Sequence, residues 1–263
     1  MAAYLFDGKA FAAGILQQVA DGVRVIDRPI RLATILSGRN PAAKAYTQIK
    51  ARTAEKLGIE FEAHDLTEVA AAERIIKTLN KGERINGIMI QLPFAGGEAD
   101  EKLCRLIVPA KDADGLNPTS GICPATVRAV AAIVEEGLEK TGRAGSGQLK
   151  MAVVGSRGNI GRGIMHNYVK DGRFELLGMD KGELDQTKLQ QAEVVISAAG
   201  QPDLLGPEMI KPGAIVIDVG YPGGDVQSGV RETAGFLTPV PGGVGPVTVA
   251  MLFRNLLELR EKE

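Results

Sequence analysis

The stretch that decides the fold is MAVVGSRGNIGRG, residues 151–163. Four apolar residues lead into Gly155, and two further glycines follow at Gly158 and Gly161. A buried strand that ends in a glycine-rich turn and continues as a helix is a common phosphate-binding arrangement in α/β proteins. The missing side chains let backbone N–H groups approach a phosphate, and the helix N-terminus adds a partial positive charge. Because the spacing is not GxGxxG, the turn alone also fits an ordinary tight connection between a strand and a helix.

The rest of the chain repeats this alternation of short apolar runs and amphipathic segments. Apolar runs predict strands over 31–36, 59–64, 88–91, 151–154, 174–179, 194–198 and 215–219. Helical spacing of apolar residues predicts helices over 8–25, 42–57, 68–79, 100–107, 126–136, 161–170, 185–190 and 247–259. Strands joined by crossover helices form mostly parallel sheets, so the fold class is α/β. The polar, glycine-rich residues 137–147 are interpreted as a join between two domains.

The composition argues against several classes of partner. The 263 residues carry a formal net charge of −1, which argues against nucleic acid and against a charged membrane surface. Two cysteines, Cys104 and Cys123, lack metal-ligand spacing, and the chain has only two histidines, so no metal site is expected. No apolar run approaches the ~20 residues needed to cross a bilayer, and the N-terminus lacks the pattern of a signal peptide. We therefore expect a cytoplasmic protein.

Polar side chains suited to chemistry stand on one helix and at the ends of predicted strands. Tyr46 and Lys50 share a helix face, where the simpler interpretation is an aromatic ring packed beside a lysine stem. The alternative is a lysine in a cleft whose proton affinity is tuned by its surroundings. Gln91 ends a buried strand, and the segment 111–115 places two carboxylates in a glycine-terminated turn. Such an acid pair most often serves the turn itself.

The most unusual string is TPVPGGVGPVT, residues 238–248, which holds three prolines and three glycines without a charge. It fits a rigid linker. It also fits a backbone held still against a flat ligand, because glycines free backbone donors to approach and prolines restrict the chain. The string leads into a helix expected to begin at Val247.

Together these strings resemble the FolD-type bifunctional methylenetetrahydrofolate dehydrogenase/methenyltetrahydrofolate cyclohydrolases. Several separate motifs agree, and they span nearly the whole chain. The matching segments are 45–50 (AYTQIK), 91–93 (QLP), 111–115 (KDADG), 214–220 (AIVIDVG), 224–226 (GDV) and 238–248 (TPVPGGVGPVT).

The resemblance implies which residues form the site. Lys50 is the central catalytic group, assisting proton transfers with Gln91, while Tyr46 stacks on the folate ring system. Asp114 accepts hydrogen bonds from pterin nitrogens, whereas Asp112 is expected to shape its loop. Further residues implied to bind the tetrahydrofolate substrate are Leu92, Pro239, Gly242 and Gly243. Residues expected to bind the NADP or NAD cofactor are Gly155, Ser156, Arg157, Gly158, Ile160, Gly161, Asp180, Ala199, Gly200, Tyr221 and Thr248.

The resemblance also implies the organisation of the chain. Residues 1–137 and 239–263 form a folate-binding catalytic domain, to which the C-terminal helix returns. Residues 138–238 form a Rossmann-like dinucleotide-binding domain, and one cleft between the domains binds the folate. A homodimer is expected.

The nucleotide half departs most from the family pattern. The family's turn reads Gly-Arg-Ser, whereas here Ser156 precedes Arg157 and a later proline is lost. Asp180 follows Gly155 at close to the spacing of the acidic residue that binds the ribose 2′-OH in dinucleotide folds. A carboxylate repels a 2′-phosphate, although Lys181 and Arg157 could offset that repulsion. We therefore expect NAD to be favoured over NADP.

Two other functions remain open from the sequence. A monofunctional member would retain only one of the two activities, because the altered turn could weaken the dehydrogenase. A non-catalytic folate- or nucleotide-binding regulator would have no reason to keep Lys50, Gln91 and Asp114 together.

Overall fold

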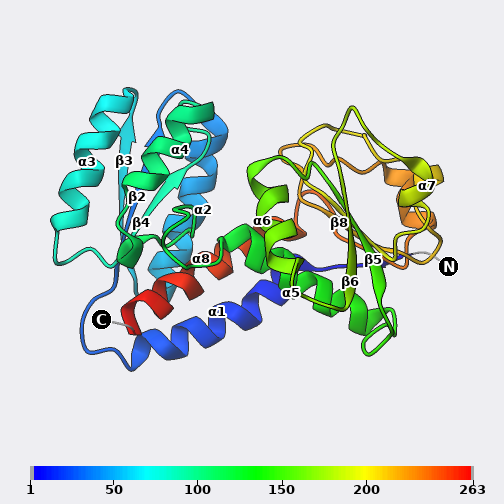
Figure 1. Ribbon diagram of the computed structural model, residues 1–263. Helices are drawn as coiled ribbons and strands as arrows, with labels where there is room; N and C mark the ends of the chain where they lie inside the picture. Colours follow the sequence, from blue (N-terminus) through cyan, green and yellow to red (C-terminus); the bar gives the residue numbers. More distant parts are fainter. Residues whose placement is uncertain (1–2, 262–263) are drawn as a thin grey trace. The chain divides into compact units, whose positions relative to one another are not determined.

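A computed structural model describes residues 3–261 (Figure 1). The chain divides into two compact units, which are described separately. One, the six-stranded unit, is formed by Met1–Ala12 and Thr126–Thr248, and the other, the three-stranded unit, by Ala13–Ala125 and Val249–Glu263. The predicted catalytic domain reaches residues 1–2 and 262–263, which lie outside the described residues.

The three-stranded unit is built on a parallel sheet in the order β3-β2-β4. Its strands are β2 (Arg31–Ser37), β3 (Glu60–Leu66) and β4 (Gly87–Gln91). The helices α2 (Pro41–Leu57) and α3 (Val69–Lys81) make the crossovers, and α4 (Gly97–Leu106) follows β4. The predicted helices and strands of this region are confirmed, with ends that shift by up to three residues.

Alternation along β4 separates the two faces of this sheet. Ile88 and Ile90 pack with residues of α3 and α4 in one hydrophobic cluster. Met89 and Gln91 point to the opposite face, where both accept hydrogen bonds from Lys50 of α2. The period of two in a strand therefore aims one polar and one sulfur-containing side chain at the same helix.

Both ends of α2 are fixed by local sequence. The side chain of Asn40 accepts hydrogen bonds from the backbone N–H groups of Ala42 and Ala43, and Pro41 occupies the first turn. Gly58 ends the helix in the left-handed conformation, with φ of 72°, as the sequence predicts. A helix held at both ends is a firm support for a functional side chain.

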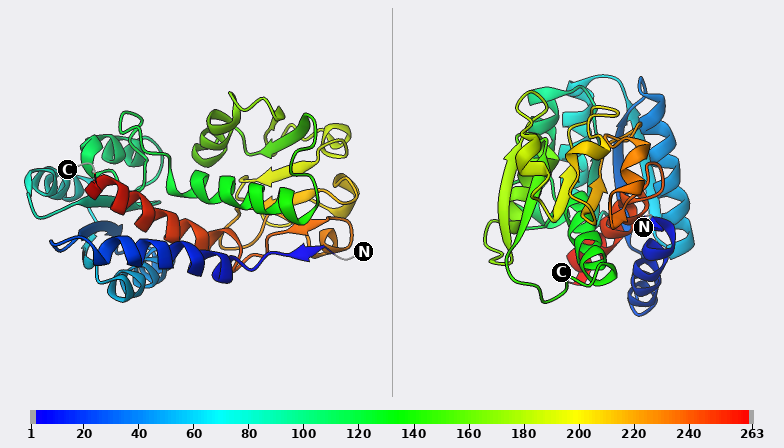
Figure 2. Two further views of the ribbon diagram at one scale, coloured as in Figure 1. Left: turned by 90° about the horizontal axis from the view of Figure 1, so that it is seen from below. Right: turned by 90° about the vertical axis from the view of Figure 1, so that its right-hand side faces the viewer.

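The C-terminal helix α8 (Val244–Glu261) lies beside α1 (Gly8–Arg24), as the red and blue helices of Figure 2 show. Arg254 donates a hydrogen bond to Gln18, with 3.0 Å between the two atoms. The fully buried Asn255 donates to the backbone oxygens of Ala113 and Cys123. The C-terminal helix therefore returns to the three-stranded unit, as expected. Within residues 3–261, no helix is long and apolar enough to span a membrane.

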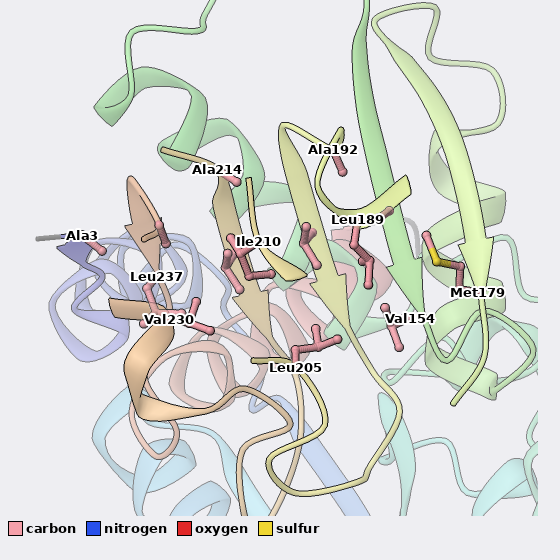
Figure 3. Packing of buried hydrophobic residues seen from close by; sticks show 14 residues of the cluster. Ala3, Val154, Met179, Leu189, Ala192, Leu205, Ile210, Ala214, Val230 and Leu237 are labelled. Carbon is pink, nitrogen blue, oxygen red and sulfur yellow. The ribbon is translucent and has the colours of Figure 1, made fainter. Parts of the chain in front are cut away.

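The six-stranded unit contains a wholly parallel sheet in the order β1-β9-β8-β7-β5-β6. Its strands are β1 (Tyr4–Leu5), β5 (Leu149–Val154), β6 (Phe174–Met179), β7 (Val194–Ser197), β8 (Ile215–Asp218) and β9 (Phe236–Leu237). Its helices are α5 (Ala125–Lys140), α6 (Asn159–Tyr168) and α7 (Gln186–Leu189). Figure 3 shows one layer of its core, in which Val154, Leu205 and Leu237 belong to a single buried cluster.

Three features of this unit differ from the sequence-based expectation. The two-residue strands β1 and β9 were not predicted, because two residues carry no periodicity; Tyr4 pairs with Phe236. The helix α5 extends to Lys140, into the first part of the predicted join at residues 137–147, and Gly137 lies directly against Ile215 of the sheet. By contacts along the chain, residues 3–12, 126–137 and 239–248 group with the six-stranded sheet, while the division of the chain into a folate-binding and a nucleotide-binding domain stays a prediction. Finally, α8 begins at Val244 instead of Val247, so the end of the tail string is helical.

Candidate active site

Lys50 is the centre of the polar cluster in the three-stranded unit. It lies on the buried face of α2, and only 5% of it is exposed. Its Nζ donates to Gln91 Oε1 at 2.9 Å and to Met89 Sδ at 3.5 Å. The same Nζ lies 5.7 Å from the centre of the Tyr46 ring, within range of a cation–π contact. The functional interpretation of Tyr46 and Lys50 is thus supported by burial and by directed contacts.

The environment of Lys50 changes its proton affinity. Burial lowers the pKa of Lys50 from 10.5 to about 8, and the charge of Asp114 opposes part of this change. Burial likewise raises the pKa of the Asp114 carboxyl, while the positive charge of Lys50 acts against that rise. With a pKa near 8, about one tenth of the Lys50 side chains are neutral at pH 7. Lys50 can therefore both accept and donate a proton near neutral pH.

The loop that carries the two neighbouring carboxylates is organised by one of them. Asp112 is buried, and its carboxylate accepts hydrogen bonds from the backbone N–H groups of Gly115, Leu116 and Asn117. Gly115 has φ of +71°, and a Cβ there would lie 2.8 Å from neighbouring backbone atoms. Asp112 thus shapes the loop, as the sequence analysis expects. The half-buried Asp114 is near enough to Lys50 for the charge of each to act on the pKa of the other.

A cavity of about 370 Å³ lies at the carboxyl edge of the three-stranded sheet. The end of β2 and the loops after β2, β3 and β4 line it, and its lining residues are Ser37, Arg39, Asn40, Thr67, Pro93, Phe94, Ala95 and Gly96. Gln91 ends β4 two residues before Pro93, and the Leu92–Pro93 peptide bond is cis. This edge is where ligands bind in open α/β sheets.

The glycine-rich turn of the six-stranded unit follows β5, whose two neighbours in the sheet are β6 and β7. The chain continues from β5 to β6 on one side of it and then crosses to β7 on the other side. Such a reversal of strand order is a topological switch point. Gly155 has φ of +83°, and a Cβ at Gly161 would lie only 2.0 Å from the backbone oxygen of Gly155. The N-cap of α6 is Gly158, which has no side chain that could occupy the first N–H groups of the helix. The first N–H groups of α6 are therefore suited to hold a pyrophosphate.

Asp180 follows β6 and lies at the same turn. Its carboxylate accepts hydrogen bonds from Ser156 Oγ and from the backbone N–H of Arg157, both at 3.2 Å. The Arg157 guanidinium contacts Asp180 at 3.2 Å and Glu183 at 2.6 and 3.3 Å. The sequence analysis missed Glu183. Its position three residues after Asp180 in the same loop was the only available signal.

The loop after β7 is held by a residue to which no role was assigned. Ala199 and Gly200 donate their backbone N–H groups to the carboxylate of Asp225, which is fully buried. Ser197 Oγ and Gln201 N donate to the same carboxylate. Asp225 fixes the loop that contains two of the expected cofactor-binding residues.

The remaining predicted site residues also belong to the six-stranded unit. Ile160 and Tyr221 are exposed, and Thr248 Oγ1 donates to the backbone of its own helix. Gly242 has φ of +107°, and a Cβ at Gly243 would lie 2.6 Å from Pro239 O, so the tail string is tightly folded. Within its unit, each group of residues forms a cluster, one around Lys50 and one around Gly155. In the described part of the chain, no three His, Cys, Asp or Glu side chains form a metal-binding group.

Comparisons with known proteins agree with this division. Residues 6–114 match the family description "Tetrahydrofolate dehydrogenase/cyclohydrolase, catalytic domain", and residues 124–263 match the NAD(P)-binding domain of the same family. The chain is 33% identical over 282 residues to a bifunctional protein FolD of Moorella thermoacetica, covering 98% of this chain and 99% of that protein.

Solved structures give the same result. A bifunctional FolD from Campylobacter jejuni is 29% identical, with a TM-score of 0.87 and coverage of 99% of both chains. A FolD from Trypanosoma brucei, solved with NADP cofactor and an inhibitor, is 30% identical with a TM-score of 0.87, covering 100% of this chain and 98% of that one.

Proposed function

Because the chain belongs to the tetrahydrofolate dehydrogenase/cyclohydrolase family, we propose that it performs both reactions of that family. It oxidises methylenetetrahydrofolate to the methenyl form with NAD(P), and it hydrolyses the methenyl form to formyltetrahydrofolate in one-carbon metabolism. Both family domains are present, and relatives named bifunctional cover nearly the full length of the chain.

The observation that carries this proposal is the buried Lys50, held by Gln91 and with its pKa lowered to about 8. A neutral Lys50 accepts a proton from water as the water oxygen bonds to the methenyl carbon. The resulting ammonium then returns a proton to the substrate nitrogen as the carbon–nitrogen bond breaks, and the remaining hydroxyl proton passes to water, which leaves the formyl group. One group thus serves as base and then as acid, which requires a pKa close to the working pH.

The neighbours of Lys50 position the substrate and the amine. The Tyr46 ring, next to Lys50 Nζ, supplies a face on which the folate rings stack. The Asp114 carboxylate accepts hydrogen bonds from the guanidine-like edge of the pterin. Gln91 holds Lys50 Nζ in place at 2.9 Å. Pro239, Gly242 and Gly243 remain proposed folate-lining residues.

The oxidation requires the six-stranded unit. The turn from Gly155 to Gly161 and the uncapped start of α6 support a site for the cofactor pyrophosphate. Bound NAD(P) accepts the hydride that leaves the methylene carbon. Asp225 acts indirectly, because it fixes the loop at Ala199 and Gly200.

An absorbance assay that follows methenyltetrahydrofolate tests the proposal. Starting from methylenetetrahydrofolate, the full chain should form the methenyl form only when NAD or NADP is present. Starting from the methenyl form, it should accelerate decay without any nucleotide. Failure of both reactions would leave a non-catalytic binding protein.

The altered nucleotide turn is the specific observation that favours a second candidate, a monofunctional cyclohydrolase. The same assay separates the two functions, because such a protein would catalyse the decay but not the formation.

A cytoplasmic homodimer is part of the proposal and is supported by the family resemblance and by the low cysteine content. Light scattering on the purified chain would measure the number of subunits.

A further inference from the structure

Arg157 lies in the glycine-rich turn, and its guanidinium is engaged by two carboxylates of the loop after β6. It contacts Glu183 through two nitrogens, at 2.6 and 3.3 Å, and Asp180 through Nε at 3.2 Å. Two parallel contacts between an arginine and a carboxylate form the same fork that would otherwise bind a phosphate. Glu183 therefore competes with a phosphate for Arg157.

Asp180 is placed at the edge where the ribose is bound in dinucleotide folds. Met179 O accepts hydrogen bonds from Gly155 N at 2.8 Å and from Ser156 N at 3.1 Å, so the end of β6 lies beside the phosphate-binding turn. The carboxylate of Asp180 already accepts bonds from Ser156 and Arg157. Asp180 Oδ2 already faces both Ser156 Oγ and Arg157 Nε, whereas Oδ1 accepts one bond, from Arg157 N, so Oδ1 keeps a lone pair for a ribose hydroxyl.

The charges around this position do not favour a second phosphate. Asp180, Glu183 and Arg157 sum to one negative charge. Lys181 is an additional exposed cation in the loop, and solvent and salt screen its charge as they screen those of Arg157 and Glu183, so the directed contacts of Arg157 with the two carboxylates matter more than the net charge. A 2′-phosphate would have to displace Glu183 from Arg157 while remaining next to Asp180.

We propose that Glu183 and Asp180 together make this site selective for NAD, with Glu183 withholding Arg157 from the 2′-phosphate of NADP. The inference rests on the nucleotide-binding function proposed above and adds the residue that sets its specificity. Asp180 accepts a hydrogen bond from the free 2′-hydroxyl of NAD. Glu183 is a specificity residue that acts through Arg157 without touching NAD.

Calorimetric titration of the full chain tests this proposal without relying on turnover. The probes are NAD, NADP, and the fragments 5′-AMP and adenosine 2′,5′-bisphosphate, all at one fixed ionic strength. The wild type should bind NAD more tightly than NADP. Glu183→Gln should strengthen binding of the bisphosphate and NADP about two- to fivefold, since the phosphate no longer has to break an exposed ion pair to reach Arg157, and leave AMP unchanged.

Two further variants make the result specific. Adding Arg157→Ala to Glu183→Gln should remove the gain for the 2′-phosphorylated ligands. Glu175→Gln changes the same charge on an exposed residue of β6 and should leave the ratio of NAD to NADP affinity unchanged.

The outcomes separate this inference from the proposed function. Tighter binding of NADP than NAD by the wild type would overturn the selectivity while leaving the enzyme function intact. The role of Glu183 would also be overturned if Glu183→Gln left the ratio of NAD to NADP affinity unchanged, or if the control Glu175→Gln changed that ratio equally. Absence of binding by both nucleotides would contradict the nucleotide-binding function itself.

Discussion

Lys50 Nζ lies 2.9 Å from Gln91 Oε1, and this bond joins the middle of α2 to the last residue of β4. The two residues are 41 positions apart in the chain. The bond exists because α2 is capped at both ends and because Gln91 shares a strand face with Met89. The buried amine is thereby fixed at the carboxyl edge of the sheet.

Replacing Lys50 by methionine should abolish hydrolysis of methenyltetrahydrofolate. Loss of a general acid–base group typically costs about 10²–10⁴ in rate, and methionine keeps the apolar stem that packs in the unit. The decay of the methenyl absorbance measures the effect. Lys56→Met, at an exposed position of the same helix, is the matched control and should retain the wild-type rate. A Lys50→Met protein with an unchanged rate would remove Lys50 from the mechanism.

The hydrolysis should depend on pH through Lys50. The neutral amine is the base, and its pKa is about 8 in the folded protein, so kcat/KM should rise with pH and level off above about pH 8. The rate is measured in overlapping buffers after subtraction of the uncatalysed decay at each pH. A profile that is flat between pH 6 and 9 would contradict the assignment.

The same pKa predicts a change in stability with pH. An unfolded lysine titrates near 10.5, whereas folded Lys50 titrates near 8, so between these values the unfolded chain binds more protons. The contribution of Lys50 to the free energy of unfolding therefore rises with pH across this window, by up to about 3 kcal/mol. Denaturant unfolding measures the free energy of unfolding of the wild type and of Lys50→Met. From pH 7 to pH 10, the wild type should gain stability relative to the variant. A constant difference would mean that the pKa of Lys50 is not lowered.

Local motifs were enough to predict where the candidate residues stand in the chain, whereas their roles in a site came from the family resemblance. The strand ends at Gln91 and Gly155 and the helix that carries Lys50 follow from apolar patterns and from cap residues. The role of Asp112 in its loop followed from ordinary turn chemistry.

The rest depends on contacts between segments that no local pattern reports. Glu183 matters only because Arg157 folds back onto the loop after β6. Asp225 matters because it accepts bonds from a loop 24 to 28 residues earlier in the chain. Met89 became part of the site through the strand alternation that also aims Gln91. The strands β1 and β9 were missed because each has two residues and gains its stability from pairing alone.

Substitutions at Gln91 should move the pH profile in opposite directions. Gln91→Leu removes an acceptor that stabilises the ammonium form, so the pKa of Lys50 falls and the rise in rate shifts to lower pH. Gln91→Glu places a negative charge beside the amine, so the pKa rises and the profile shifts to higher pH. Gln48→Glu adds the same charge at an exposed position of α2 and should leave the profile in place. If both Gln91 variants shifted the pH profile in the same direction, a direct interaction between Gln91 and Lys50 would be contradicted.

Alanine at Gly161 should separate the two activities. A Cβ there would lie 2.0 Å from Gly155 O and 2.9 Å from Ser156 Cα, so the turn must open and the first N–H groups of α6 move away from the pyrophosphate. We expect the KM for NAD to rise at least about tenfold and NAD binding to weaken in parallel, because several charge-assisted bonds are lost. Hydrolysis of methenyltetrahydrofolate depends on Lys50 in the other unit and should continue at a rate close to that of the wild type. Gly172→Ala is the matched control, since a Cβ there meets no atom within 4 Å, and it should leave both activities unchanged. If Gly161→Ala oxidised methylenetetrahydrofolate with unaltered NAD affinity, the glycine-rich turn would not be the phosphate-binding element of this chain.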